Sequence, residues 1–311
     1  MSVTSSARLT GTRTVTVGVH EDDHVTPEET RKRFPAAKVG RVFIPPLKHG
    51  APPEKVYDKI LNVTKPWRGG GVYVSYKPSP RAVANGQWTK VHHDIGLWLE
   101  RNPWVKIIVH HEPEGGDHAL EGPVFRDMFT RARNEIKDGW AGATVAYCAM
   151  AYQWRSSRNP RWAGDAARNP GAWKEVVADE YLCDVYSGQN GRNGAFDADI
   201  ALGDHPGWTN WFDEIVRPHL ENDEEVVYGL GERGFMDDEN RVRATTMNKE
   251  SDWLDRAFDR YAATRRAVDL PPSVYLGWNS IGTETERDWL WDDDAVEAMR
   301  NLTTRYAKHV Y

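Results

Sequence analysis

Short apolar runs alternate with amphipathic stretches along the chain. The runs have the length of strands and are rich in β-branched and aromatic residues. Several of them are apolar on both faces, which is typical of parallel strands that are covered by helices. The pattern predicts eight strands, at residues 14–20, 39–45, 71–76, 105–110, 143–150, 181–186, 226–230 and 273–278.

The stretches between these runs carry helix signals. Thr26, followed by Pro27 and then by Glu28 and Glu29, reads as an N-cap with proline and acidic residues in the first turn. In other stretches the apolar residues recur every three or four positions and so form one face. This spacing predicts helices at residues 88–101, 124–136, 208–220, 253–267 and 294–310.

Eight strand–helix units in a chain of 311 residues predict an α/β protein with a (β/α)8 TIM barrel. A doubly wound open sheet is the alternative, but such a sheet usually carries a Gly-rich loop that opens a helix. Here residues 69–71 are glycines that precede a strand instead. No linker rich in Pro, Gly or Ser divides the chain. Residues 1–311 are therefore predicted to form one domain, with residues 1–13 as a short N-terminal extension.

Composition excludes several classes of protein. The net charge of −6 disfavours a nucleic-acid partner, and no apolar stretch is long enough for membrane insertion. The N-terminus lacks the apolar core of a signal peptide, which predicts a cytoplasmic protein or one exported by another route. The two cysteines, Cys148 and Cys183, stand outside any metal-binding motif and read as reduced core thiols. We expect neither a metal ion nor a cofactor.

Long segments follow several of the predicted strands. In a TIM barrel these segments gather at the carboxyl ends of the strands, where such enzymes build their active sites. The segments are rich in Trp, Asn, Arg, Asp and Gly, a composition that suits a polar ligand with apolar faces, such as a sugar. They lie at residues 153–173, 187–206, 233–249 and 279–292.

Two glutamates stand directly after predicted strands. Glu112 follows the fourth strand and Glu232 follows the seventh, so both are expected at the same end of the barrel. A lone glutamate is more often a solvated surface group, but this pair provides the two carboxylates that glycoside hydrolysis needs. Burial and a negative neighbour would raise the pKa of Glu112, and hydrogen bonds would keep Glu232 ionised.

The placement of these two glutamates resembles the clan A glycoside hydrolases. The His111–Glu112 pair is most similar to glycoside hydrolase family 26, a group of β-mannanases and related endo-glycanases. The resemblance implies retaining chemistry, with Glu112 as acid/base and Glu232 as nucleophile. It also implies that His111 binds the sugar 2-hydroxyl or the nucleophile, and that Tyr186 orients the nucleophile. Trp278 would be the aromatic floor beneath the sugar.

Pro113 and Glu114 depart from the family pattern, in which an apolar residue and Asn follow the acid/base. The sugar is therefore left open, and a divergent member is expected.

Other residues have two interpretations each. His110 is either a second polar contact to the sugar or a buried, hydrogen-bonded histidine. Trp154 and Trp162 either stack on the sugar or pin a long loop. Lys77 and Arg233 are candidates to contact hydroxyl or acidic groups of a sugar. Arg233 has the alternative of pairing with a surface acid. At the end of the first strand, residues 20–22 either line the cleft or cap the helix that follows.

Three functions remain open from the sequence. The first is an endo-acting, retaining glycosidase whose substrate is a polysaccharide or oligosaccharide, with a cell-envelope or surface glycan as one candidate. The second is a non-catalytic glycan-binding module, such as a phage tail component with other virion tail proteins as partners. The absent signal peptide motivates this phage interpretation, in which the protein is associated with the virion. The third is a metal-dependent barrel hydrolase with His110 and His111 as ligands.

Overall fold

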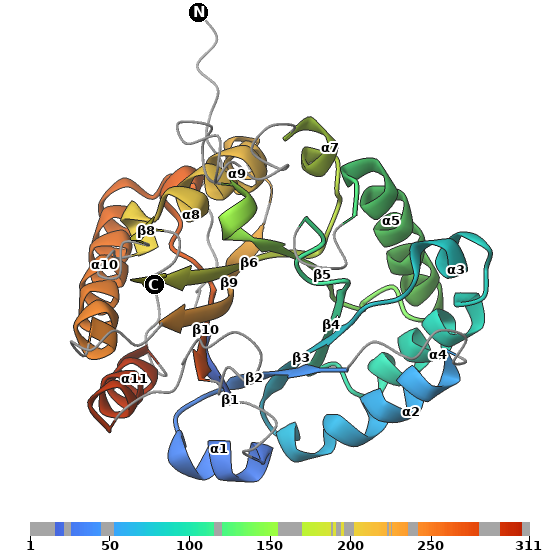
Figure 1. The fold of residues 1–311 in the computed structure, drawn as a ribbon, viewed down its shortest axis with the longest axis horizontal. Coiled ribbons are helices and arrows are strands. Elements are labelled where there is room, and N and C mark those ends of the chain that lie inside the picture. The colour runs from blue at the N-terminus through green and yellow to red at the C-terminus, as the bar shows by residue number, and fades with distance from the viewer. Residues whose placement is uncertain are drawn as a thin grey trace, which may run out of the picture.

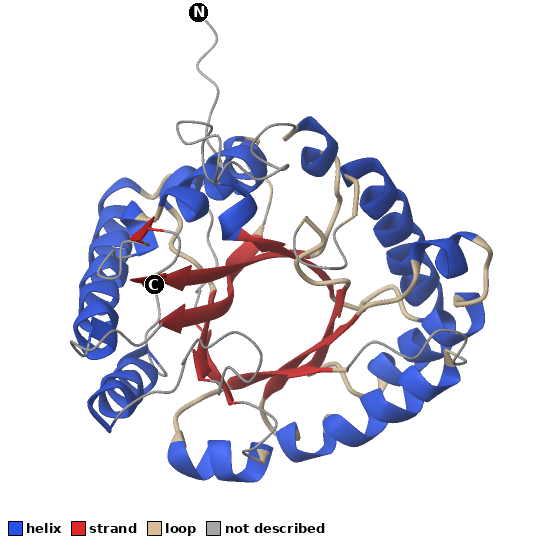
Figure 2. Cartoon of the chain, viewed as in Figure 1, coloured by secondary structure: helices blue, strands red, loops and turns tan. Residues whose placement is uncertain are grey.

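The computed structural model is a closed barrel of eight parallel strands surrounded by helices (Figures 1 and 2). The strands are β1 (Thr16–Glu21), β2 (Val39–Phe43), β3 (Gly71–Tyr76), β4 (Val105–Val109), β5 (Val145–Met150), β6 (Glu180–Ser187), β9 (Val227–Phe235) and β10 (Val274–Asn279). They pair in the order β1-β10-β9-β6-β5-β4-β3-β2. The predicted (β/α)8 fold is confirmed, and each of the eight predicted strands is present.

The structure describes part of the chain. The described residues are 16–21, 26–44, 53–114, 120–154, 170–187, 189–190, 194–195, 202–222, 224, 226–235, 242–279 and 293–306. The predicted N-terminal extension, residues 1–13, lies outside them. A small antiparallel pair, β7 (Gln189–Asn190) and β8 (Gly194–Ala195), stands apart from the barrel sheet.

Helices cover the outside of the barrel (Figure 2). The α-helices are α1 (Pro27–Arg33), α2 (Glu54–Val63), α3 (Pro80–Ala84), α4 (Thr89–Glu100), α5 (Gly122–Gly139), α7 (Gly171–Lys174), α8 (Pro206–Trp211), α9 (Arg217–Glu221), α10 (Val242–Thr264) and α11 (Asp293–Tyr306). Short 3-10 turns are η1 (Lys65–Trp67), η2 (Ala151–Trp154), η3 (Leu202–Asp204) and η5 (Ala267–Asp269), and a π-helical turn, η4 (Phe212–Val216), joins α8 to α9.

The predicted helices are present, with changed ends. Thr26 caps α1 through a capping box with Glu29, in which each side chain accepts a hydrogen bond from the backbone N–H of the other residue. The stretch predicted as one helix at 208–220 is divided by the π-helical turn η4. The helix predicted at 253–267 begins earlier, at Val242.

Apolar residues form two clusters that alternate along the strands. The outer cluster fills the layer between the strands and the helices, and it includes Val74 and Tyr147. The inner cluster consists of Val39, Tyr73, Ile108, Ala146, Cys148, Leu182, Val274 and Leu276. Because successive strand residues point to opposite faces, these inner positions fill the barrel interior.

Two smaller predictions concern cysteines and membranes. Cys148 and Cys183 are free thiols without exposed surface, as predicted for core cysteines. Among the described residues, no helix combines the length and the apolar character needed to cross a bilayer.

Candidate active site

The chain leaves β4 through two residues with left-handed backbone. His110 has a φ of 55° and Glu112 a φ of 51°, values that are uncommon for residues other than glycine. The His110 N–H donates to the Tyr76 carbonyl, and the Glu112 N–H donates to the Cys148 carbonyl, both at 2.8 Å. The neighbouring strands therefore hold this segment in a conformation that costs about 1–3 kcal/mol for each such residue. Strained backbone of this kind clusters at functional sites.

The two histidines of this segment face opposite sides of the barrel wall. The His111 ring lies edge-on to Phe43 at 4.9 Å, and the Arg41 guanidinium lies 4.6 Å from the centre of the same Phe43 ring. Burial, Arg41 and Lys77 lower the pKa of His111 well below its ordinary value, so its ring is neutral. The His111 Nδ1 atom is buried and has no hydrogen-bond partner among the described residues.

His110 packs outward. Its ring lies 6.5 Å from that of Phe125 in α5, and the residue is 4% exposed. His110 is thus buried, as its second interpretation has it, and its contact with a sugar stays a prediction.

A β-bulge aims Glu232 into the barrel. Cys183 of β6 pairs with Leu230, but the next β6 residue, Asp184, pairs with Glu232, so Gly231 is an extra residue in β9. Leu230 belongs to the outer cluster, and simple alternation would turn Glu232 to the same outer side. The bulge reverses this, and Glu232 contacts residues of the interior.

Gly231 also leaves space at this point. A Cβ atom there would lie 2.5 Å from Asp184 Oδ1, 2.7 Å from Cys148 Sγ and 2.9 Å from Arg41 Nη1. Such contacts are far inside van der Waals separation, so only glycine fits the bulge without displacing these groups.

Glu232 lies in a buried charged cluster that the sequence analysis missed. Arg41 Nη1 lies 2.7 Å from Asp184 Oδ1 and 3.1 Å from Glu232 Oε1. The Tyr186 hydroxyl donates to Glu232 Oε2, which is the contact that the resemblance implied. Arg41 and Asp184 follow the inner-cluster residues of β2 and β6 by two positions, so the same alternation directs them inward. We call Arg41, Glu112, Asp184 and Glu232 the inner charge cluster.

The two glutamates of this cluster have raised pKa values. Removal from water and the charge of Asp184 raise the pKa of Glu112 to about 8, although Lys77 and Arg41 oppose the shift. Burial, Asp184 and Glu112 likewise raise the pKa of Glu232 well above its ordinary value, against the effect of Arg41. The direction for Glu112 is the predicted one. The shift of Glu232 is opposite to the direction expected from its hydrogen bonds, because burial and the neighbouring acids outweigh Arg41.

Trp154 has a structural contact in place of the predicted sugar contact. It is 1% exposed, and its indole N–H donates to Glu114 Oε1 at 3.0 Å. Glu114 also accepts from the Tyr147 hydroxyl at 3.0 Å and from the Met150 N–H at 3.3 Å. A sugar-stacking ring needs an exposed face, and the Trp154 ring is buried in the free protein. Burial raises the pKa of Glu114 to about 7, with the donors opposing.

Arg233 is also structural. Its Nε lies 2.5 Å from Glu250 Oε1 of α10, and both side chains are fully buried. The Tyr275 hydroxyl donates to the other oxygen of Glu250. The acid that pairs with Arg233 is therefore buried, and neither of the two interpretations of Arg233, a sugar contact or a pair with a surface acid, describes this contact. We call Arg233 and Glu250 the outer ion pair, to which Tyr275 donates a hydrogen bond.

Several predicted positions have no described side chain. Trp278 lies in β10, where its backbone pairs with His20 of β1 and Gly234 of β9. The side chains of Trp278, His20 and Glu21 lie outside the described part of the structure, as do Asp22 and Trp162 entirely. Lys77 is half-buried, and its positive charge lowers the pKa values of Glu112, Glu232 and His111.

The described side chains offer little to a metal ion. No three or more His, Cys, Asp or Glu groups come together in an arrangement that could hold one, as far as the described residues extend.

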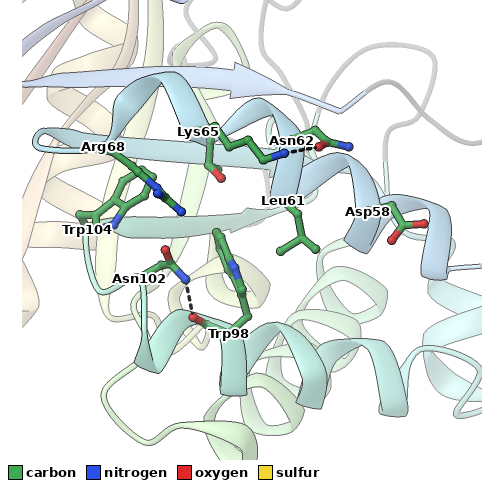
Figure 3. Close-up of a pocket in the computed structure, with 9 residues that line it drawn as sticks. Asp58, Leu61, Asn62, Lys65, Arg68, Trp98, Asn102 and Trp104 are labelled. Carbon is green, nitrogen blue, oxygen red and sulfur yellow. Dashed lines mark hydrogen bonds between the residues drawn. The ribbon is translucent and has the colours of Figure 1, made fainter.

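A separate hollow of about 580 Å³ lies between α2 and α4, near the amino ends of β3 and β4 (Figure 3). Trp98, Trp104 and Arg68 are among its lining residues, and none of the predicted catalytic or sugar-binding residues lines it.

Comparisons with known proteins identify the fold. No family model matches the sequence, and no curated relative matches it either. The structure of XacCel5A in complex with cellopentaose is 11% identical, with a TM-score of 0.55, and covers 94% of this chain and 99% of that chain. A β-glucosidase, 1317, is 11% identical at a TM-score of 0.58, with 89% of both chains covered. A β-mannanase from the blue mussel Mytilus edulis is 8% identical at a TM-score of 0.52, covering 94% of this chain and 92% of that chain.

At such low identities the likeness shows the barrel fold alone. The structural neighbours include glycosidases that share the eight-stranded barrel. The resemblance to family 26 in particular stays a prediction, as does an origin in a phage.

Proposed function

We propose that this protein is a retaining glycoside hydrolase that acts on a polysaccharide or oligosaccharide, with Glu232 as nucleophile and Glu112 as acid/base. The observation that carries the proposal is the inner charge cluster. Two glutamates from the ends of β4 and β9 come under the same buried charges: Asp184 raises the pKa of both, Glu112 also raises the pKa of Glu232, and donors already hold the Glu232 carboxyl. Active sites of TIM barrels lie at this end of the strands.

In the first step, one Glu232 oxygen attacks the anomeric carbon, and the bond from that carbon to the leaving oxygen breaks. Glu112 gives its proton to the leaving oxygen. A pKa of about 8 keeps Glu112 protonated at neutral pH, as a general acid requires. Arg41 and Tyr186 hold the Glu232 carboxyl from two sides, so the attacking oxygen is fixed in direction.

In the second step, a water molecule attacks the anomeric carbon, and Glu112 takes the water's proton. The bond from the sugar to Glu232 breaks, and the carboxylate returns. Attack from the opposite face in each step leaves the anomeric configuration unchanged overall.

His111 and Trp278 are proposed sugar contacts. The neutral His111 ring has an unpartnered Nδ1 close to Arg41, where it can exchange a hydrogen bond with a sugar hydroxyl. Trp278 is proposed as the floor beneath the sugar, on the basis of its place near the end of β10.

The test is a panel of polysaccharides that includes cell-envelope glycans, with release of reducing ends as the readout. Glu232→Gln is the control, because it keeps the shape of the side chain and removes the nucleophile. Proton NMR of the first product anomer distinguishes retention from inversion, and product length distinguishes endo from exo action. Binding of a glycan without release of reducing ends would favour the non-catalytic module instead.

A further inference from the structure

Two tryptophans line the hollow between α2 and α4 (Figure 3). Trp98 lies in the last turn of α4, and Trp104 lies in the short link from α4 to β4. Both residues are half-buried and pack against the outer cluster. The hollow lies near the amino ends of β3 and β4, so it is at the opposite end of the barrel from Glu112 and Glu232.

The indole N–H groups of these two rings are unpaired donors that reach the surface. Neither group donates a hydrogen bond within the part of the chain that the structure describes, and neither nitrogen is among the buried polar atoms that lack a partner. The indole nitrogens of Trp67 and Trp211, in contrast, are buried without a partner. An indole N–H at the surface can donate to a ligand that also packs against the ring.

Three polar side chains in the lining of the hollow have hydrogen-bonding capacity to spare. The Asn102 amide donates to the Trp98 carbonyl at 2.9 Å, which fixes the amide and leaves its oxygen as an acceptor (Figure 3). The Arg68 guanidinium and the Asp58 carboxylate have neither an ion pair nor a hydrogen bond among the described residues. The hollow therefore offers both donors and acceptors beside two aromatic rings.

We propose that this hollow is a carbohydrate-binding site, separate from the proposed catalytic cleft, that takes a pyranose unit of a glycan chain. A pyranose has a C–H face that packs on an aromatic ring and hydroxyl groups that both donate and accept. The volume of about 580 Å³ is in the usual range of small-molecule pockets. We call the residues that carry the proposal the α2–α4 site: Asp58, Arg68, Trp98, Asn102 and Trp104.

Other classes of ligand fit the α2–α4 site less well. A purely apolar ligand would cover Arg68 and Asn102 without replacing the hydrogen bonds that these side chains make to water. A compact anion would meet the negative charge of Asp58 and would leave both rings unused. A sugar uses the rings, the donors and the acceptors together.

The α2–α4 site binds without cleaving. Asp58 is the one acidic residue among those that line the hollow, whereas glycoside hydrolysis uses two carboxyl groups. A glycan chain held there keeps its other units close to the protein, which raises their effective concentration at a second site on the same molecule. The inference goes beyond the proposed function, and the binding itself requires no hydrolysis.

The test is an NMR titration of the full chain labelled with ¹⁵N at the tryptophan indoles, in the Glu232→Gln background so that no probe is cleaved. The probes are β-1,4-linked hexasaccharides of glucose, of mannose and of N-acetylglucosamine, with inorganic phosphate as the control ligand. Trp98→Phe and Trp104→Phe assign the two signals. We expect both signals to shift and saturate with at least one hexasaccharide, at a dissociation constant of about 1 mM or lower. Phosphate should leave them in place.

Three variants show where the sugar binds. Trp98→Ala and Arg68→Ala should each weaken the binding seen at the Trp104 signal by about tenfold or more. Arg68→Ala changes an exposed side chain, so it keeps the test valid if Trp98→Ala does not fold. Trp140→Ala is the matched control, because Trp140 is also half-buried and packs against the outer cluster but does not line the hollow. Its binding should equal that of the parent protein.

Indole signals of Trp98 and Trp104 that stay in place with all three hexasaccharides would overturn the proposal. An equal response to phosphate would also overturn it, because it would mark Arg68 as an anion site. Shifts of these two signals in a protein that hydrolyses no glycan would refute the proposed function and leave this result standing. With an active substrate, Arg68→Ala should raise KM for the polymer and leave kcat/KM for a short oligosaccharide unchanged.

Discussion

Glu232 and Arg233 are neighbours in β9, yet they belong to two differently built groups of buried charges. Arg233 pairs with Glu250 in the outer ion pair, one cation for one anion, and Tyr275 satisfies the remaining oxygen. Glu232 shares Arg41 with Asp184, and Glu112 raises the pKa of Glu232. A buried ion pair with one positive and one negative charge can join a strand to a helix. A buried group with more acidic than basic side chains holds protons that can be transferred, which is what a catalytic site requires.

The largest expected effect separates the two groups. Glu232→Gln should abolish hydrolysis by several orders of magnitude and leave the fold intact, because it removes the nucleophile and relieves a crowded charge. Glu250→Gln should leave the folded protein active but lower its free energy of unfolding by about 3–5 kcal/mol, because Arg233 loses its partner. Activity assays and urea denaturation of both variants check this. The comparison fails if Glu250→Gln loses activity without losing stability.

The bulge that separates the two groups gives the next effect. Gly231→Ala should lower kcat by at least about 100-fold, because the added methyl group displaces Asp184 and Arg41 and misplaces Glu232. Circular dichroism shows whether the fold survives, and the rate with the best substrate of the panel measures the effect. A fully active Gly231→Ala protein would mean that the geometry at the bulge is unimportant for the reaction.

The unbalanced cluster also predicts how stability depends on pH. Glu112 has a pKa of about 8 in the folded protein and an ordinary value of 4.5, so the folded state binds its proton more tightly. The stabilisation is complete below about pH 4.5 and is lost as the pH rises through about 8. The free energy of unfolding should therefore fall between pH 5 and pH 8, and Glu112→Gln should reduce this fall.

Denaturation curves at several pH values measure this slope. Glu114, Glu232 and Glu250 also have raised pKa values and should leave a smaller slope in the variant. Equal slopes in the wild type and in Glu112→Gln would show that Glu112 titrates normally.

The smallest expected effect concerns Trp154, which lies on the structural side of the comparison. Trp154→Phe keeps an aromatic ring, although a smaller one, and removes the indole N–H that donates to Glu114, so it should cost at least about 1–2 kcal/mol of stability and leave KM unchanged. Thermal unfolding and substrate saturation curves measure the two quantities. A raised KM at unchanged stability would restore Trp154 as a sugar contact.

The sequence predicted the elements better than the orientation of their side chains. Apolar periodicity located all eight strands, and the Thr26–Glu29 spacing located the start of α1, because both signals are local. The bulge at Gly231 depends on how β9 pairs with β6, so no local pattern reveals which way Glu232 turns. Trp154 is buried and donates to Glu114, which lies 40 residues earlier, so no local pattern reveals that contact.

The missed residues had one usable signal. Arg41 and Asp184 are charged residues in the middle of otherwise apolar strand runs, at 39–45 and 181–186. Charged side chains are rarely buried unless they are paired, so each implies a partner inside the barrel. The sequence could suggest that the two residues pair, but only the closed order of strands brings β2 and β6 across from each other.

The most direct test of the central claim is mass spectrometry of the peptide that contains Glu232 during turnover. An activated 2-fluoro glycoside of the sugar identified by the panel would slow the second step, and acid would stop the reaction. We expect the added mass of one glycosyl group on Glu232, and none in Glu232→Gln. A label on Asp184 or Glu112, or active turnover with an inverted product and no label, would contradict it.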